Sequence, residues 1–289
     1  GNNVAIGSGA LLVATTAADN TAVGTLALTA NSSGTDNTAV GYASLDANTT
    51  GADNTAIGDN ALGANITGSY NTAIGSDALL LNTASENTAV GQGALDANST
   101  GTKNTAMSNG ALGANTTGDY NVGLGYRALQ VNTTADDNTA VGNDTLRLNT
   151  TGASNTAVGS LALDANTTAS NNTGVGYAAL SANTTGADNT SFGYSSLAGN
   201  TTASYNTAVG RSALGAVNTG AQNVAMGYLT LDANTSGSRN TGLGSGALGA
   251  NTTGSYNVAI SYDSLGLNTT GDNNTGVGYN TLAANTTGA

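Results

Sequence analysis

The sequence predicts an all-β fold, a parallel β-solenoid (β-roll) with one coil per repeat. Three observations carry this prediction: a 17-residue unit repeats along the chain, apolar residues alternate within it, and turn-forming residues separate the apolar segments. Helical solenoids use roughly 33 to 47 residues per repeat, so a unit of this length is too short for them.

The repeat has the form N-T-A-V-G-x-x-A-L-x-A-N-T-T-G-x-x, and we number its positions 1 to 17 from the first Asn. Coils start at Asn3, Asn20 and Asn37 and continue to residue 289 as a single array of seventeen units. The unit at 71–86 has 16 residues; it is shortened in NTASE, which marks that segment as a turn. Neither end resembles a cap, so we expect the array to continue in a longer chain or by end-to-end polymerisation.

Each coil is expected to hold two short strands, at positions 1–5 and 8–11, with Gly, Asn, Asp and Ser in the turns between them. Position 4 is always a larger apolar residue and position 9 is Leu in all seventeen units. We therefore expect both positions to point inward and form the core. Members of this expected core ladder are Val40, Leu45, Ile57, Leu62, Leu112, Leu129, Phe192 and Leu197.

Position 3 is Ala, Gly or Ser in every unit. Because side chains alternate along a strand, it is expected on the face opposite to position 4, outside the coil. A small residue kept on an exposed strand indicates that another chain packs against it; crowding at a tight turn is the alternative. The expected inter-chain face includes Ala39, Ala56, Ala73, Gly123 and Gly174.

A family resemblance appears in two short segments, NVAIG at 3–7 and NVAIS at 257–261. They resemble the S-V-A-I-G signature of YadA-like heads in trimeric autotransporter adhesins. The longer form NTAVGYxALxxNTTG resembles repeat arrays of phage-type tail fibres and large bacterial surface proteins. The resemblance implies a left-handed β-roll, three chains side by side, and a place on a cell surface or a virion fibre.

The composition excludes several classes of function. The chain has 5 Lys and Arg against 17 Asp and Glu, a net charge of −12, so it lacks the basic stripe that nucleic acid requires. No apolar run approaches the roughly 20 residues that span a bilayer. There is no His or Cys, and the acids fall at variable turn positions, so we expect neither an enzyme nor a cofactor or metal site.

Asn-Thr-Thr at positions 12–14 allows two interpretations. The asparagines stack as a hydrogen-bonded ladder that caps the turn, or they are acceptors for N-glycosylation, because they match Asn-x-Ser/Thr. The column, meaning the residues at one repeat position in consecutive coils, comprises Asn48, Asn65, Asn98, Asn115, Asn132, Asn149, Asn166, Asn183, Asn200, Asn234, Asn251, Asn268 and Asn285.

Tyrosines gather at the turn positions 6 and 17. Exposed tyrosines can contact glycans or a neighbouring chain, and they can equally pack across adjacent turns of one chain. The candidates for ligand contact are Tyr42, Tyr70, Tyr120, Tyr126, Tyr177 and Tyr194.

Two further ligands, calcium and ice, have a partial signal in the sequence. Aspartates at positions 16 and 17, such as Asp19, Asp36 and Asp53, suggest calcium, but no calcium-loop pattern is present and a solvated turn is the alternative. Threonine in every coil suggests ice binding. The argument against it is that the strand threonine of position 2 is expected on the core side, where it cannot contact ice.

These patterns favour a structural function: an extracellular fibre, stalk or adhesin head segment that presents a repetitive surface. The expected partners are further copies of the chain, as a trimer or an end-to-end filament, with a cell-surface or glycan ligand as an alternative. Two other functions remain open, a glycosylated self-polymerising filament subunit and a carbohydrate- or ice-binding solenoid.

Overall fold

The computed structural model describes residues 1–216 and 219–288, and in these residues it contains strands and turns but no helix. It divides into two compact units, Gly1–Asp144 and Thr145–Ala289. The first unit contains β1 (Val4–Ile6), β2 (Thr21–Val23), β3 (Thr38–Val40), β4 (Thr55–Ile57), β5 (Thr72–Ile74), β6 (Thr88–Val90), β7 (Thr105–Met107), β8 (Val122–Leu124) and β9 (Thr139–Val141). The second contains β10 (Thr156–Val158), β11 (Thr173–Val175), β12 (Thr190–Phe192), β13 (Thr207–Val209), β14 (Val224–Met226), β15 (Thr241–Leu243), β16 (Val258–Ile260) and β17 (Thr275–Val277).

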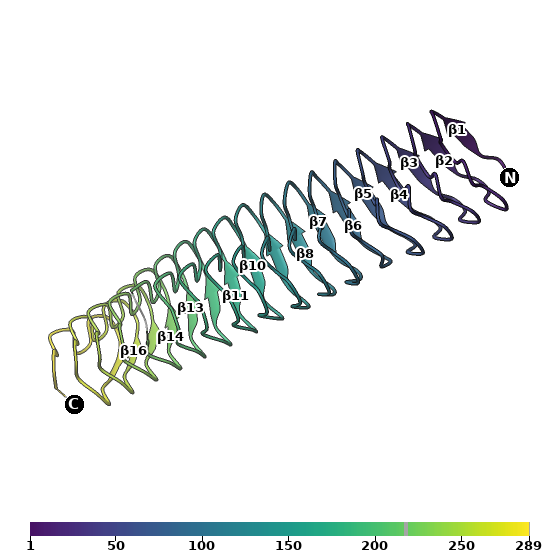
Figure 1. Ribbon diagram of the computed structural model, residues 1–289. Helices are drawn as coiled ribbons and strands as arrows, with labels where there is room; N and C mark the ends of the chain where they lie inside the picture. The colour runs from purple at the N-terminus through teal and green to yellow at the C-terminus, as the bar shows by residue number, and fades with distance from the viewer. Residues whose placement is uncertain (217–218, 289) are drawn as a thin grey trace. The chain divides into compact units, whose positions relative to one another are not determined.

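Within each unit the strands form a parallel sheet in which every strand pairs with the same residues of the next coil (Figure 1). Ala39 of β3 lies beside Ala56 of β4, and Ala73 of β5 beside Ala89 of β6 across the 16-residue unit. The predicted all-β solenoid with about 17 residues per coil is therefore confirmed. The shortened unit keeps its strand in register, so its missing residue is absorbed elsewhere in the coil.

Each coil has one strand, and the expected second strand at positions 8–11 is wrong. In the fourth coil the backbone has positive φ at Gly58 (+141°), Asn60 (+53°), Leu62 (+54°) and Tyr70 (+62°). Alternating positive and negative φ cannot produce an extended strand. Stacking persists nonetheless, because the Leu62 N–H donates to the Ala78 carbonyl oxygen at 3.0 Å in the next coil.

The core contains five of the eight residues of the expected ladder. The position-9 leucines of that ladder are fully buried, as predicted: Leu45, Leu62, Leu112, Leu129 and Leu197. The position-4 residues Val40, Ile57 and Phe192 point outward instead, and Ile57 and Phe192 are 39% and 45% exposed. The predicted alternation within the strand is present, but the small residue of position 3 faces the interior.

Position 3 is consequently not an inter-chain face. Ala39, Ala56 and Ala73 are fully buried inside their own coils. A Cβ added to Gly123 would lie 3.3 Å from Leu112 Cγ, and one added to Gly174 would lie 3.3 Å from Leu163 Cδ1. The interior between strand and leucine is too narrow for a larger side chain, which explains the restriction to small residues.

Candidate functional site

The outer strand face consists of the first and third residues of strands β1–β17. The first residue is Thr or Val and the third is Val, Ile, Leu, Met or Phe. Third residues such as Met107, Phe192 and Met226 are more than a third exposed, and each middle residue from β2 onward is buried. An apolar residue thus faces outward in every coil.

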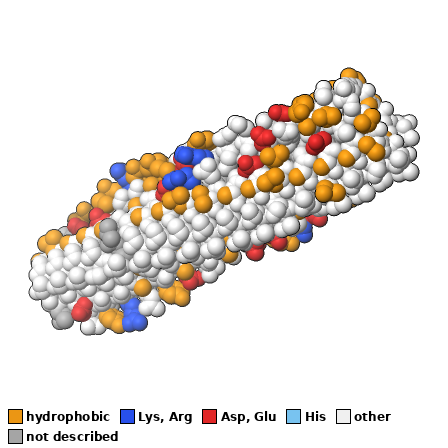
Figure 2. All heavy atoms as spheres, viewed as in Figure 1, with side chains coloured by type: hydrophobic (Ala, Val, Ile, Leu, Met, Phe, Trp, Pro, Cys, Tyr) orange, Lys and Arg blue, Asp and Glu red, His pale blue; other side chains and the backbone are white. Residues whose placement is uncertain are grey.

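The outer strand face carries no charge. None of its residues is Asp, Glu, Lys or Arg, although the whole chain has 22 such residues, 17 acidic and 5 basic. The charged residues occupy turn positions, for example Asp46, Asp59 and Lys103. Figure 2 shows charged side chains in separate groups, with a broad band between them that contains none.

The position-12 asparagines form the predicted hydrogen-bonded ladder. Asn48 Nδ2 donates to Asn31 Oδ1 and to the Gly51 carbonyl oxygen, both at 3.0 Å, and Asn48 Oδ1 accepts from Asn65 Nδ2 at 3.1 Å. The side chain of Asn48 is fully buried. A glycan on Nδ2 would remove a donor from this ladder and require space that the coil interior does not contain, so the fold opposes the glycosylation alternative.

A second asparagine ladder was missed from the sequence. At position 1, Asn54 Nδ2 donates to Asn37 Oδ1 at 3.0 Å and to the Gly68 carbonyl oxygen at 2.9 Å. Asn65 Nδ2 of the first ladder donates to that same carbonyl at 3.0 Å. The Gly68 carbonyl therefore joins the two ladders. The signal was available, since position 1 is Asn in all seventeen units.

Four of the position-6 tyrosines stack in pairs along the chain's own coils. Tyr177 and Tyr194 stack with ring centroids 5.3 Å apart, and Tyr262 and Tyr279 stack at 5.5 Å. Sugar rings bind tyrosine through the ring face, and in these pairs the facing surfaces cover one another. Packing across adjacent turns is thus present in these two pairs, while contact with a glycan stays a prediction.

Other candidate tyrosines pair with cations. Tyr120 lies under Lys103 Nζ, which is 5.1 Å from the ring centroid, and Tyr126 lies 4.7 Å from the Arg127 guanidinium. Tyr42 and Tyr70 are exposed side chains. These contacts join neighbouring turns or neighbouring residues and do not converge on one cavity.

The carboxylates occupy solvated turns. Asp19, Asp36 and Asp53 are exposed, and the described residues contain no group of three acids that could hold a metal ion. Burial raises the pKa of Asp46, and at position 10 of other coils it does the same for Asp96 and Asp232. These three acids lie in different coils and form no acid–base pair.

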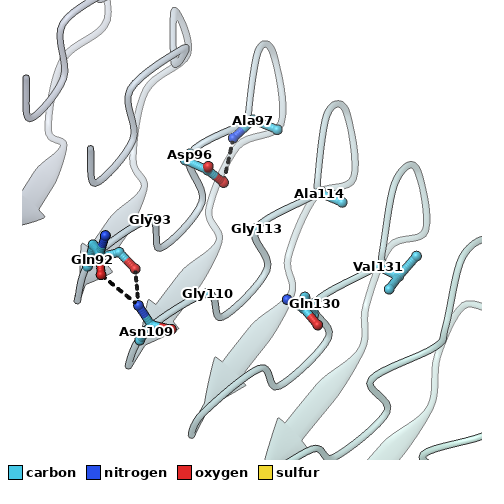
Figure 3. A pocket seen from close by; sticks show the side chains of 10 residues that line it. All are labelled: Gln92, Gly93, Asp96, Ala97, Asn109, Gly110, Gly113, Ala114, Gln130 and Val131. Carbon is cyan, nitrogen blue, oxygen red and sulfur yellow. Dashed lines mark hydrogen bonds between the residues drawn. The ribbon is translucent and has the colours of Figure 1, made fainter. Parts of the chain in front are cut away.

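A shallow groove of about 600 Å³ lies beside coils six to eight (Figure 3). Gly93, Gly110 and Gly113 are among the residues that line it. Its polar groups bond to one another: Asn109 Nδ2 donates to Gln92 Oε1 at 3.1 Å, and the Ala97 N–H donates to Asp96 Oδ1 at 3.1 Å. With one carboxylate among its lining residues, the groove offers no pair of groups for acid–base chemistry.

Comparison with known proteins adds no name to these surfaces. No family model matches the chain, and no curated protein matches it. The described residues also contain no helix long and apolar enough to cross a membrane.

Proposed function

We propose that the chain is a structural segment of an extracellular fibre or adhesin head, in which copies associate laterally through the outer strand face. The observation that carries this proposal is the exposed apolar residue at position 4, which never becomes polar in seventeen coils. Exposed apolar surface on this scale marks an interaction site.

The charge distribution favours a second copy of the same chain as the partner. Two chains with a net charge of −12 repel one another. The outer strand face is the surface on which that repulsion is smallest, because it carries no charged residue. A second copy also has the same coil spacing, so its columns match along the whole face.

The outer strand faces of the two units together offer the area of a specific interface. A three-residue strand with a neighbour spacing of 4.8 Å presents about 50 Å² per coil, so the nine strands of the first unit present about 450 Å² and the eight strands of the second about 400 Å². Specific interfaces bury about 800 Å² per partner. The resemblance to YadA-like heads favours three copies, and it places such an assembly on a cell surface or a virion fibre.

Continuous ladders suit a projecting structural segment. The strands, the leucine turn and the position-1 asparagine column repeat their hydrogen bonds from coil to coil. Backbone groups that are paired in this way leave few loop tips for proteases to enter. The proposed work of the chain is therefore to maintain a durable, repetitive surface.

Three lysines on the outer strand face test the association. We expect Val40→Lys, Ile57→Lys and Ile74→Lys together to convert the oligomer to a monomer of 27.8 kDa in sedimentation velocity, because charges would be buried unpaired. The control places three lysines in the same turn of two consecutive coils, at Thr50, Ile66 and Thr67, which are exposed on positions 13 and 14. A monomeric wild-type protein, or equal dissociation by both triple variants, would contradict the proposal.

The outward threonines favour ice binding as a second candidate. Thr38, Thr55 and Thr72 lie on the outer strand face, so the expectation that position 2 shares the core side is wrong. Uneven third residues, such as Val175 beside Phe192, make this face less regular than a flat threonine array. Thermal hysteresis measured on the wild-type protein, without the lysine substitutions, would support ice binding, and its absence would leave the fibre proposal alone.

A further inference from the structure

Two tyrosine pairs differ from every other tyrosine that the structure describes. Tyr177 and Tyr194 stack with an interplanar angle of 16°, and Tyr262 and Tyr279 with one of 12°. All four side chains are exposed. Each pair occupies position 6 of consecutive coils, so the strand spacing of about 4.8 Å keeps the two rings in contact.

Other position-6 tyrosines have a residue of a different type at position 6 of the next coil. Arg211 holds position 6 between Tyr194 and Tyr228, and its guanidinium lies 5.6 Å and 5.9 Å from their ring centroids. Tyr42 is followed at position 6 of the next coil by Asp59. Tyr42 and Tyr228 are exposed but have no stacked tyrosine partner, which makes them internal controls.

We propose that the Tyr177–Tyr194 and Tyr262–Tyr279 pairs are sites of oxidative dityrosine cross-linking between consecutive coils. A one-electron oxidant takes one electron and the phenolic proton from each ring. The two radicals then form a carbon–carbon bond between their ortho positions. The hydrogen on each bonded carbon moves to the phenolic oxygen, which restores both phenols.

The balance requires an oxidant of the peroxide class. The two rings together lose two electrons and two protons, and one hydrogen peroxide accepts them through a peroxidase to give two waters. Proximity selects the site, because groups held in contact react at a far higher effective concentration than groups on separate molecules. The bond would tie residues 17 positions apart in the chain and oppose separation of the two coils.

Oxidation of the full chain with peroxidase and hydrogen peroxide tests the inference. After unfolding and digestion with trypsin, residues 148–211 form one fragment with Tyr177, Tyr194 and Tyr205, and residues 240–289 form another with Tyr256, Tyr262 and Tyr279. We expect each fragment to become lighter by two hydrogen atoms, with tandem mass spectrometry locating the bond at the stacked pair. The yield should not fall when the protein is diluted.

Two variants separate stacking from general reactivity. Tyr194→Phe keeps a ring in the stack but removes the phenol, so the first cross-link should disappear while Tyr262–Tyr279 remains. Asp59→Tyr places a phenol one coil after Tyr42 and should create a new cross-link in the fragment 1–103. Dityrosine spread evenly over all tyrosines, or found mainly as fragments joined from two chains, would overturn the inference.

Discussion

The leucine of position 9 carries the interior of the coil. In Leu62 it has a φ of +54° and is fully buried. A left-handed conformation costs about 1–2 kcal/mol for a residue with a Cβ, and burial of a leucine contributes about 1.5–3 kcal/mol. Burial therefore offsets the backbone cost, provided that the side chain is large enough to fill the coil.

Leu62→Ala and Ile57→Ala compare an inward and an outward side chain of the same coil. We expect Leu62→Ala to lower the free energy of unfolding by about 2–5 kcal/mol, because it leaves a cavity. Ile57→Ala should change it by less than about 1 kcal/mol, since the side chain is already exposed. Urea unfolding at low protein concentration measures both free energies. A larger loss of stability for Ile57→Ala than for Leu62→Ala would contradict the placement of Leu62 in the core and Ile57 outside it.

The sequence predicts which strand residues share a face, but not which of the two faces lies inside the coil. Alternation correctly put Thr55 and Ile57 on one side of the strand and Ala56 on the other. The assignment then failed because it took the larger residue as buried, as in a wide core. Here the interior of the coil holds Leu62, small residues and the two asparagines Asn54 and Asn65, so Ala56 is the one that fits. Its restriction to Ala, Gly or Ser was the correct signal, interpreted as an outer contact.

At the scale of the coil, the turns depend on positive φ more than on turn composition alone. Position 5 is glycine in most coils, and a Cβ on Gly58 would lie 2.4 Å from the Gly75 carbonyl oxygen. Two coils depart from this pattern, with Ser108 at φ +121° and Ser261 at +101°. Such geometry costs a residue with a Cβ about 1–3 kcal/mol.

Ser108→Gly and Gly58→Ser should change stability in opposite directions. Ser108→Gly removes backbone strain, and after the added chain entropy of glycine we expect a gain of about 1 kcal/mol. Gly58→Ser introduces the strain together with a backbone clash and should destabilise by more than that. Thermal unfolding of the two variants beside the wild-type protein measures the effect, and the same sign for both would refute the role of position 5.

The shortened coil shows how far the turn can be predicted. Its deletion was placed in residues 82–86, and there Asn82 Nδ2 donates to the Ala84 carbonyl two residues on, where Asn65 reaches Gly68 three residues on. The position-1 column continues past it, since the Asn87 N–H donates to Asn71 Oδ1 at 3.0 Å. The position-12 column is interrupted there, because Asn65 Oδ1 accepts no hydrogen bond from Asn82. Composition located this turn, but the absence of the second strand depended on φ angles that residue types such as Leu do not reveal.

At the scale of the whole molecule, charge is confined to the turns and its effect on stability depends on pH. The chain has 17 acids, and burial raises the pKa of Asp46, Asp96 and Asp232. A carboxyl whose pKa is higher in the folded protein than in the unfolded chain favours folding when it is protonated. That contribution is complete below the unfolded pKa of about 3.9 and is lost as the pH rises through the folded pKa.

Replacing the three acids with asparagine isolates this contribution. Asp46→Asn, Asp96→Asn and Asp232→Asn remove the charge, and at residue 96 the amide oxygen can still accept from the Ala97 N–H. We expect the triple variant to unfold at a higher temperature than the wild-type protein at pH 7, and the difference to disappear as the pH approaches 3. All other acids are common to both proteins, so their titration cancels in the comparison. Parallel curves of melting temperature against pH would show that burial at position 10 does not govern this dependence.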